Sequence, residues 1–305
     1  MKNRIIQRLS NNLGNQMFMY AFGYALSKEL SRELYIDNET AYKSRNNFHK
    51  YNLNIFKFSA KLAPNTLKYL GFTGYMKRKT YKAIDRFKVK KKFYIEKKDK
   101  NKFTSFNNDF INQDFDDNLF IEGHFESEKY FSKYRSDILN EFSFNNYETL
   151  QMNNLYNKLN NSNSVSICLR RHRFSERKRQ INKHDIQDSN KFTIEQAAYV
   201  MKAIKIIKNK ISNPKFFLWS NDYEDIHKYL PDVEFTIVST NNIDLDLYLM
   251  TQSKNFIVIP SSYNWWGCWL SKNSKKIVYR PSDNFFSKFK VNNSDFWPSN
   301  WNVID

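Results

Sequence analysis

Short apolar runs alternate with longer amphipathic stretches in the second half of the chain, and this alternation constrains the fold more than any other feature. The apolar runs lie at 165–169, 215–219, 234–238, 255–259 and 276–279. Stretches with helical spacing lie between them, at 193–209, 223–230, 244–253 and 262–271. Strands that alternate with helices predict a parallel, doubly wound α/β sheet. Ligands of such sheets bind outside the carboxyl ends of the strands.

The N-terminal part begins with a unit of the same kind. Residues 4–9 have strand character, a polar turn follows, and a helix is expected from about Met17. Residues 34–37 predict a second strand, which completes a βαβ unit, and residues 51–56 carry alternate apolar positions. A stretch rich in Asn and Ser lies near residue 150, so we expect two domains, residues 1–150 and residues 151–305.

Composition narrows the class of protein. The 305 residues are 41% hydrophobic and 17% aromatic, which is enough for a folded core. The 49 Lys and Arg exceed the 31 Asp and Glu by 18, and this charge favours partners that carry phosphate: nucleic acid, an anionic membrane surface or a nucleotide. Two cysteines and five histidines show no zinc-like spacing, so we expect neither a metal site nor a disulfide framework.

No targeting or spanning segment is evident in the sequence. The most apolar run near the N-terminus, Met17 to Leu26, has only ten residues and is interpreted as a buried helix. We therefore expect a cytoplasmic protein, and the charge allows peripheral contact with the inner face of the membrane. Between Lys77 and Lys102, lysines alternate with aromatic residues. A solvated basic face is the simpler interpretation, and a patch for a membrane surface or anionic glycolipid is the alternative.

The ends of the predicted strands carry residues suited to a diphosphate. Arg170 and Arg171 follow directly on the strand at 165–169, where a guanidinium would suit a doubly charged oxyanion, although a surface basic cluster is the alternative. Ser261 and Ser262 precede a helix whose free amides could bind phosphate, or they could simply cap it. Asp222 could accept hydrogen bonds from guanine or ribose, or cap a helix. With six glycines, the chain has neither a dinucleotide fingerprint nor a Walker loop.

Six segments in order resemble the bacterial α-1,2-fucosyltransferases of glycosyltransferase family 11. They are Leu13–Ala21, Gly123–Phe131, Cys168–Arg173, Ser220–Asp222, Asp246–Met250 and Ser261–Gly267. The chain departs from the family pattern at three places. Cys168 stands where the motif has histidine, Arg173 where it has aspartate, and Asn11-Asn12 where it has two glycines.

The resemblance implies a fold and a reaction. It implies a GT-B-like α/β protein with two Rossmann-like domains that face a cleft. The implied reaction transfers L-fucose from GDP-fucose, with inversion, to the 2-hydroxyl of a galactose, without a metal or other cofactor. The N-terminal domain would bind most of the acceptor, a galactose-terminated oligosaccharide or lipid-linked glycan, and the C-terminal domain would bind the donor.

The resemblance also implies roles for individual residues. Arg170 would contact the β-phosphate, Asp222 the guanine, and the Ser261-Ser262 turn the diphosphate. The residues expected to bind substrates are Gly14, Asn15, Gln16, His124, Glu126, Arg171, Asp222, Ser261, Ser262 and Trp265. An inverting transfer also needs a group that removes the acceptor proton. The loop after the arginines offers Glu176, His184, Asp185 and Asp188, and we expect Glu176 or Asp185 to take this role.

Two kinds of alternative stay open. The enzyme could transfer fucose to another hydroxyl, or transfer another GDP-activated sugar. A basic nucleic-acid-binding protein is the alternative from another class, but it requires a basic stripe beside stacking rings. The arginine pair and the Ser-Ser turn suit a discrete diphosphate better, so no nucleic-acid partner is expected.

Overall fold

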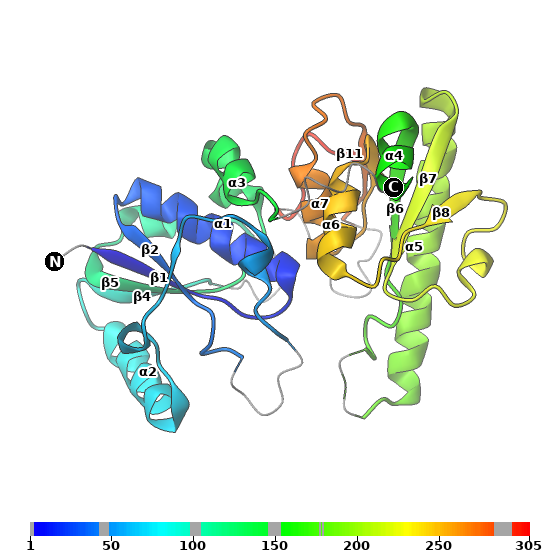
Figure 1. Ribbon diagram of the computed structural model, residues 1–305. Helices are drawn as coiled ribbons and strands as arrows, with labels where there is room; N and C mark the ends of the chain where they lie inside the picture. Colours follow the sequence, from blue (N-terminus) through cyan, green and yellow to red (C-terminus); the bar gives the residue numbers. More distant parts are fainter. Residues whose placement is uncertain are drawn as a thin grey trace. The chain divides into compact units, whose positions relative to one another are not determined.

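The chain forms two compact α/β units in the computed structural model (Figure 1). The structure describes residues 3–42, 49–97, 105–145, 154–176, 178, 180–283 and 295–305. The first unit comprises residues 1–145 and 293–298, and the second comprises residues 146–292 and 299–305. The boundary expected near residue 150 falls outside the described residues. Residues 295–298 belong to the first unit, where Phe296 contacts the ring of Phe18 at 6.1 Å.

The first unit is built on a five-stranded parallel sheet. Its strand order is β3 (Lys61–Leu62), β2 (Glu33–Asp37), β1 (Arg4–Arg8), β5 (Phe115–Glu122) and β4 (Lys91–Ile95). Helices α1 (Leu13–Glu29) and α2 (Gly71–Asp85) lie on opposite faces of the sheet (Figure 1). Nearly every residue of α1 is buried, which confirms the expected buried helix and explains why its apolar residues are not confined to one stripe.

The second unit is built on a six-stranded parallel sheet. Its strand order is β11 (Asn302–Ile304), β10 (Val278–Pro281), β9 (Asn255–Ile257), β6 (Asn163–Leu169), β7 (Pro214–Ser220) and β8 (Phe235–Ile237). Its helices are α4 (Asn154–Asn161), α5 (Lys183–Lys210), α6 (Ile243–Thr251) and α7 (Ser262–Leu270). The expected parallel, doubly wound α/β class is confirmed.

Shorter elements complete the first unit. They are helix α3 (Arg135–Glu141) and the 3₁₀ helices Leu53–Ile55, Asn65–Leu67, Asp109–Asn112, Glu128–Tyr130 and Ser132–Tyr134. The alternation seen at 51–56 therefore belongs to a 3₁₀ turn, which buries Leu53 and Ile55. The first long helix begins at Leu13, four residues before the expected start at Met17.

Two expectations for the second unit are wrong. The helix expected at 193–209 begins ten residues earlier, at Lys183, because Asn182 and Asp185 form a capping box at its start. The helix expected at 223–230 is only a 3₁₀ turn, Ile226–Lys228, preceded by Asp225 in a left-handed conformation with φ of 52°. A non-glycine residue in that conformation interrupts regular helical geometry.

Candidate functional site

Each sheet changes its winding direction once, next to its first strand. In the second unit the chain runs outward from β6 through β7 to β8, then crosses to the other side of β6 and continues through β9 and β10 to β11. The switch point therefore lies between β6 and β9. Ligands of open parallel sheets bind outside the carboxyl ends of the strands at such a point. These two strands lead into Arg170 and Arg171 and into Ser261 and Ser262.

A buried glutamine of α5 fixes the backbone of Arg170. The Gln196 Oε1 atom accepts from the Arg170 backbone N–H at 3.1 Å, and its Nε2 atom donates to the Arg170 carbonyl at 2.9 Å. Gln196 is fully buried. The Arg170 guanidinium donates to the Glu176 carboxylate, whose second oxygen accepts from the Asn221 side chain at 3.3 Å. The first arginine after β6 is thus held at its backbone and paired at its charged end.

An asparagine after β7 fixes Arg171 in the same way. The Asn221 Oδ1 atom accepts from the Arg171 N–H at 2.8 Å, and its Nδ2 atom donates to the Arg171 carbonyl at 2.9 Å. The Arg171 guanidinium pairs with the Asp222 carboxylate at 2.8 Å and lies over the Tyr229 ring at 5.4 Å. Two side-chain amides therefore set the direction of two consecutive arginines.

Asp222 pairs with two side chains of the loop after β6. Besides Arg171, the His172 Nε2 atom lies 2.7 Å from Asp222 Oδ2. Burial raises the pKa of the Asp222 carboxyl, but the Glu224 amide, His172 and Arg171 outweigh it, and the net shift is downward. His172 has φ of 56°, a conformation that turns the chain sharply after Arg171. Asp222 is thus held in its ionised, hydrogen-bond-accepting form.

Arg173 joins the two loops of the switch point. Its Nη1 atom donates to the Pro260 carbonyl at 2.9 Å, directly before Ser261, and its guanidinium lies over the Phe192 ring at 4.9 Å. The residue that departs from the family's aspartate therefore links the loop after β6 to the loop after β9.

The N-terminus of α7 presents backbone amides at the same edge. Ser261 is the N-cap residue and makes no side-chain capping bond. The first amides of a helix have no intrahelical acceptor, and the helix dipole favours an anion there. Ser261 and Ser262 are part-exposed, whereas Trp265 is fully buried and stacks on Trp269 at 5.9 Å. Trp265, expected to bind substrate, thus lies in the core, because its position on α7 faces the other tryptophans.

The two candidate bases lie in different surroundings. Glu176 pairs with Arg170 at the strand edge. Asp185 is the third residue of α5, where it completes the capping box with Asn182 and pairs with Lys178. The Lys178 hydrogen bond is the main cause that lowers the pKa of the Asp185 carboxyl. The role of general base stays a prediction for both residues.

In the first unit, polar side chains meet at the corresponding switch point. The chain runs from β1 through β2 to β3, and β5 lies on the other side of β1. Asn15, after β1, donates to the Glu126 carboxylate, after β5. Asn11 Nδ2 lies 2.8 Å from His124 Nε2. Asn15, His124 and Glu126, three of the expected substrate-binding residues, are therefore brought together.

Gln16 has a different position. It is fully buried, donates to the carbonyls of Asn11 and Lys50 at 2.8 and 2.7 Å, and accepts from the Asn52 N–H at 2.9 Å. Gly14, in the first turn of α1, is also buried. These contacts join residues 50–52 to the start of α1. The buried Gln16 amide therefore bonds to the protein backbone and has a structural role.

Glu96 shapes the loop after β5, a role that was not predicted from the sequence. Its two carboxylate oxygens accept from the backbone N–H groups of His124 and Phe125 at 2.7 and 2.9 Å. A Cβ atom at Gly123 would lie 2.3 Å from the Glu96 Cβ atom, so only glycine fits there. Gln196 was also missed, although a glutamine among the apolar positions of a helix is a visible signal. Glu96 has no such signal, because it lies in a charged stretch.

Two α/β units with parallel sheets and polar switch points are typical of glycosyltransferases with the GT-B-like fold. The family model for glycosyl transferase family 11 matches residues 5–305. The chain therefore belongs to glycosyltransferase family 11.

Curated relatives match parts of the chain. An alpha-1,2-colitosyltransferase of Escherichia coli is 25% identical over 188 residues, which cover 60% of this chain and 61% of the relative. The O-antigen biosynthesis glycosyltransferase WbnK of Escherichia coli is 29% identical over 87 residues, 27% of this chain and 29% of the relative. The chain thus spans less than two thirds of either relative's length.

Solved structures support the fold. The fucosyltransferase NodZ from Bradyrhizobium is similar with a TM-score of 0.52 and 14% identity, over 88% of this chain and 91% of that one. A NodZ alpha-1,6-fucosyltransferase crystal soaked with GDP-fucose gives the same TM-score and identity, over 88% and 93% of the two chains.

Within the described ranges, no group of three or more His, Cys, Asp or Glu side chains could hold a metal ion. None of the helices in these ranges combines the length and apolarity needed to cross a bilayer.

Proposed function

We propose that this chain is a galactoside α-1,2-fucosyltransferase. It would transfer L-fucose from GDP-fucose to the 2-hydroxyl of a galactose-containing glycan, with inversion at the anomeric carbon. The observation that carries the proposal is that Arg170 and the N-terminus of α7 follow β6 and β9, the two neighbouring strands that flank the switch point of the second unit. A guanidinium and free helix amides together suit a diphosphate.

The donor would bind at this edge of the second sheet. In the reaction the bond between the fucose anomeric carbon and the GDP oxygen breaks, and the leaving diphosphate gains negative charge. Arg170 and the first amides of α7 would stabilise that charge. Asp222, ionised beside Arg171 and His172, would accept hydrogen bonds from guanine. NodZ has been crystallised with GDP and soaked with GDP-fucose, which supports a donor of this class.

The acceptor oxygen attacks the opposite face of the sugar, and its proton passes to a base. Glu176 is the better placed candidate, since it lies beside Arg170 at the strand edge. Binding of the diphosphate to Arg170 would release the Glu176 carboxylate from its present partner. The freed carboxylate could then accept the hydroxyl proton.

Asn11, Asn15, His124 and Glu126 at the switch point of the first unit would bind the acceptor. Their amide, imidazole and carboxylate groups both donate and accept, as sugar hydroxyls require. The acceptor would be a galactose-terminated oligosaccharide or a lipid-linked glycan. No step in this scheme requires a metal ion.

A second donor deserves a direct test. The name of the colitosyltransferase relative specifies the α-1,2 linkage that we propose and a sugar other than fucose. The experiment incubates the protein with GDP-fucose, GDP-colitose or GDP-mannose and a panel of galactosides, and determines the product linkage by NMR. An α-1,2-fucosylated galactoside supports the proposal. Transfer of only another sugar, or an α-1,6 linkage, contradicts it.

A further inference from the structure

The outer face of α2 carries large apolar side chains although it faces solvent. The Phe72 side chain is 78% exposed, and Phe87, just beyond the end of the helix, is 91% exposed. Met76 and Ala83 follow Phe72 at spacings of four and seven residues, so these three side chains lie on one side of α2, and Phe87 follows in the turn after the helix. Tyr75 and Val89 are exposed beside them. A helix of a soluble domain normally turns its apolar stripe toward the core.

Polar contacts hold most of the inner face of α2 to the sheet, and the Tyr81 ring packs against the apolar cluster that includes Phe93 and Phe120. The Asp85 carboxylate accepts from the backbone N–H groups of Lys92 and Phe93 at 2.8 and 2.9 Å. Arg78 Nε donates to the Glu122 carboxylate at 2.6 Å, and Lys82 also pairs with it. Asp85 is the only residue of α2 that is buried.

The surroundings of this face are strongly basic. Residues 71–92 contain nine Lys and Arg and one acidic residue, Asp85, whose carboxylate faces inward. Glu122 pairs with Arg78 and Lys82. The remaining cations are Lys77, Lys79, Arg86, Lys88, Lys90, Lys91 and Lys92. Across the described part of the chain, none of these seven forms an ion pair with a carboxylate.

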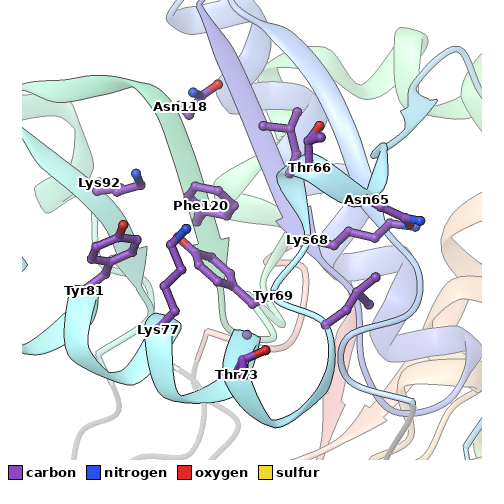
Figure 2. A pocket seen from close by; sticks show the side chains of 13 residues that line it. Asn65, Thr66, Lys68, Tyr69, Thr73, Lys77, Tyr81, Lys92, Asn118 and Phe120 are labelled. Carbon is purple, nitrogen blue, oxygen red and sulfur yellow. The ribbon is translucent and has the colours of Figure 1, made fainter.

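Two of these cations line a pocket of about 430 Å³ between α2 and the sheet (Figure 2). Lys92 Nζ lies 4.9 Å and Lys77 Nζ 5.6 Å from the centre of the Tyr81 ring. The pocket adds two ammonium groups, without carboxylate partners, to the basic surroundings of the helix.

We propose that the α2 face, defined by Phe72, Tyr75, Met76, Phe87 and Val89, docks on an anionic lipid bilayer. The aromatic and aliphatic side chains enter the boundary between headgroups and acyl chains, and the surrounding lysines contact lipid phosphates. The exposed side chains follow the length of α2, whose fifteen residues span about 22 Å. In the docked state the helix therefore lies along the membrane surface. Nucleic acid would satisfy the lysines but would leave Phe72 and Met76 in water, so the bilayer fits better.

The test is flotation of the whole protein with vesicles. One set contains phosphatidylcholine alone, and the other contains equal parts of phosphatidylcholine and phosphatidylglycerol. The variant with Phe72→Ser and Phe87→Ser removes the two most exposed rings. The matched control, Ile111→Ser with Ile194→Ser, removes two exposed isoleucines outside this face. Thermal melting verifies that both variants fold.

The wild type and the control should float with the anionic vesicles, less so as salt rises, and not with the neutral ones. The Phe72/Phe87 variant should lose at least about tenfold in partition coefficient. Equal binding of the Phe72/Phe87 variant and the Ile111/Ile194 control to anionic vesicles would overturn the proposal. No vesicle binding by the wild type would also overturn it. So would binding to single-stranded RNA that is unaffected by Phe72→Ser and Phe87→Ser, without vesicle binding. Sugar transfer to a soluble acceptor should be the same in all forms, so this test is independent of the proposed function.

Discussion

The side-chain amide of Gln196 pairs with both the N–H and the C=O of Arg170, as a neighbouring strand would. The strand β6 ends at Leu169, so Arg170 lies beyond the last residue that pairs with a neighbouring strand. A buried glutamine on α5 supplies the missing pair and fixes the direction in which the guanidinium leaves the sheet. We infer that Gln196 is a positioning residue for Arg170.

Replacement of Gln196 by leucine should therefore impair both folding and turnover. Gln196→Leu keeps most of the volume but leaves the Arg170 N–H and C=O unpaired, which should cost about 1–3 kcal/mol of unfolding free energy. The turnover number should fall by about tenfold or more as Arg170 loses its orientation. Denaturant unfolding and steady-state kinetics measure the two effects. Gln252→Leu, which removes an amide bonded only to Tyr248 and Thr251, is the control and should keep the wild-type turnover number.

The two candidate bases should respond differently to removal of their charge. Glu176→Gln should lower the turnover number by about 10²–10⁴, the range of general-base catalysis, with GDP affinity little changed. Asp185→Asn should instead lower the melting temperature, since it weakens the capping box and the Lys178 pair. If Asp185→Asn alone abolishes turnover in a folded protein, the roles are reversed. Wild-type rates for both variants would exclude this loop as the source of the base.

The strands and helices of the two units were predicted with different accuracy. The apolar run at 165–169 predicted a central strand, and β6 extends it by two residues, Asn163 and Ser164. The predicted start of helix α5 lies ten residues after its observed start at Lys183. The first turns of the helix are polar and are held by Asn182, Asp185 and Ser189 rather than by an apolar stripe. Strands β3, β4, β5 and β11 were not expected, and β3 and β11 are only two and three residues long.

The candidate site, like the fold, could be predicted from the sequence only in part. Arg170, Arg171 and Asp222 follow apolar strands, so their place at the sheet edge could be predicted from order along the chain. The contacts that Gln196 and Glu96 make depend on which distant loops come together, and no local pattern encodes them. The pairing of Glu176 with Arg170 is also a tertiary contact, formed by the turn at His172.

Stability in acid should depend on Glu122. Burial raises the pKa of its carboxyl, but Arg78 and Lys82 outweigh burial, and the net shift is below the ordinary value of 4.5. A lowered pKa means that the carboxylate stabilises the fold fully above about pH 4.5 and loses this effect as pH falls through the lowered value. Glu122→Gln should cost about 1–3 kcal/mol at pH 7, and the difference from wild type should shrink below pH 4.

Denaturant unfolding over a pH series measures this difference. Glu33→Gln, which breaks the more exposed pair with Lys61, is the control and should cost about 0–1 kcal/mol. A difference between wild type and Glu122→Gln that stays constant down to pH 3 would contradict the assignment.

Chelation should leave turnover unchanged. In the proposed mechanism the diphosphate charge is met by Arg170 and the amides of α7, so EDTA removes nothing that the reaction uses. The measurement is the initial rate of sugar transfer over an EDTA titration. Loss of turnover that Mg²⁺ or Mn²⁺ restores would show that a metal ion takes part.

Calorimetric titration with GDP tests the central claim most directly, because it needs no knowledge of the acceptor. The wild type should bind GDP, Arg170→Ala should bind it at least about tenfold more weakly, and Arg86→Ala, on α2, should bind it as the wild type does. Equal GDP affinity of the wild type and Arg170→Ala, or no binding of GDP by the wild type, would contradict a donor site at the switch point of the second unit.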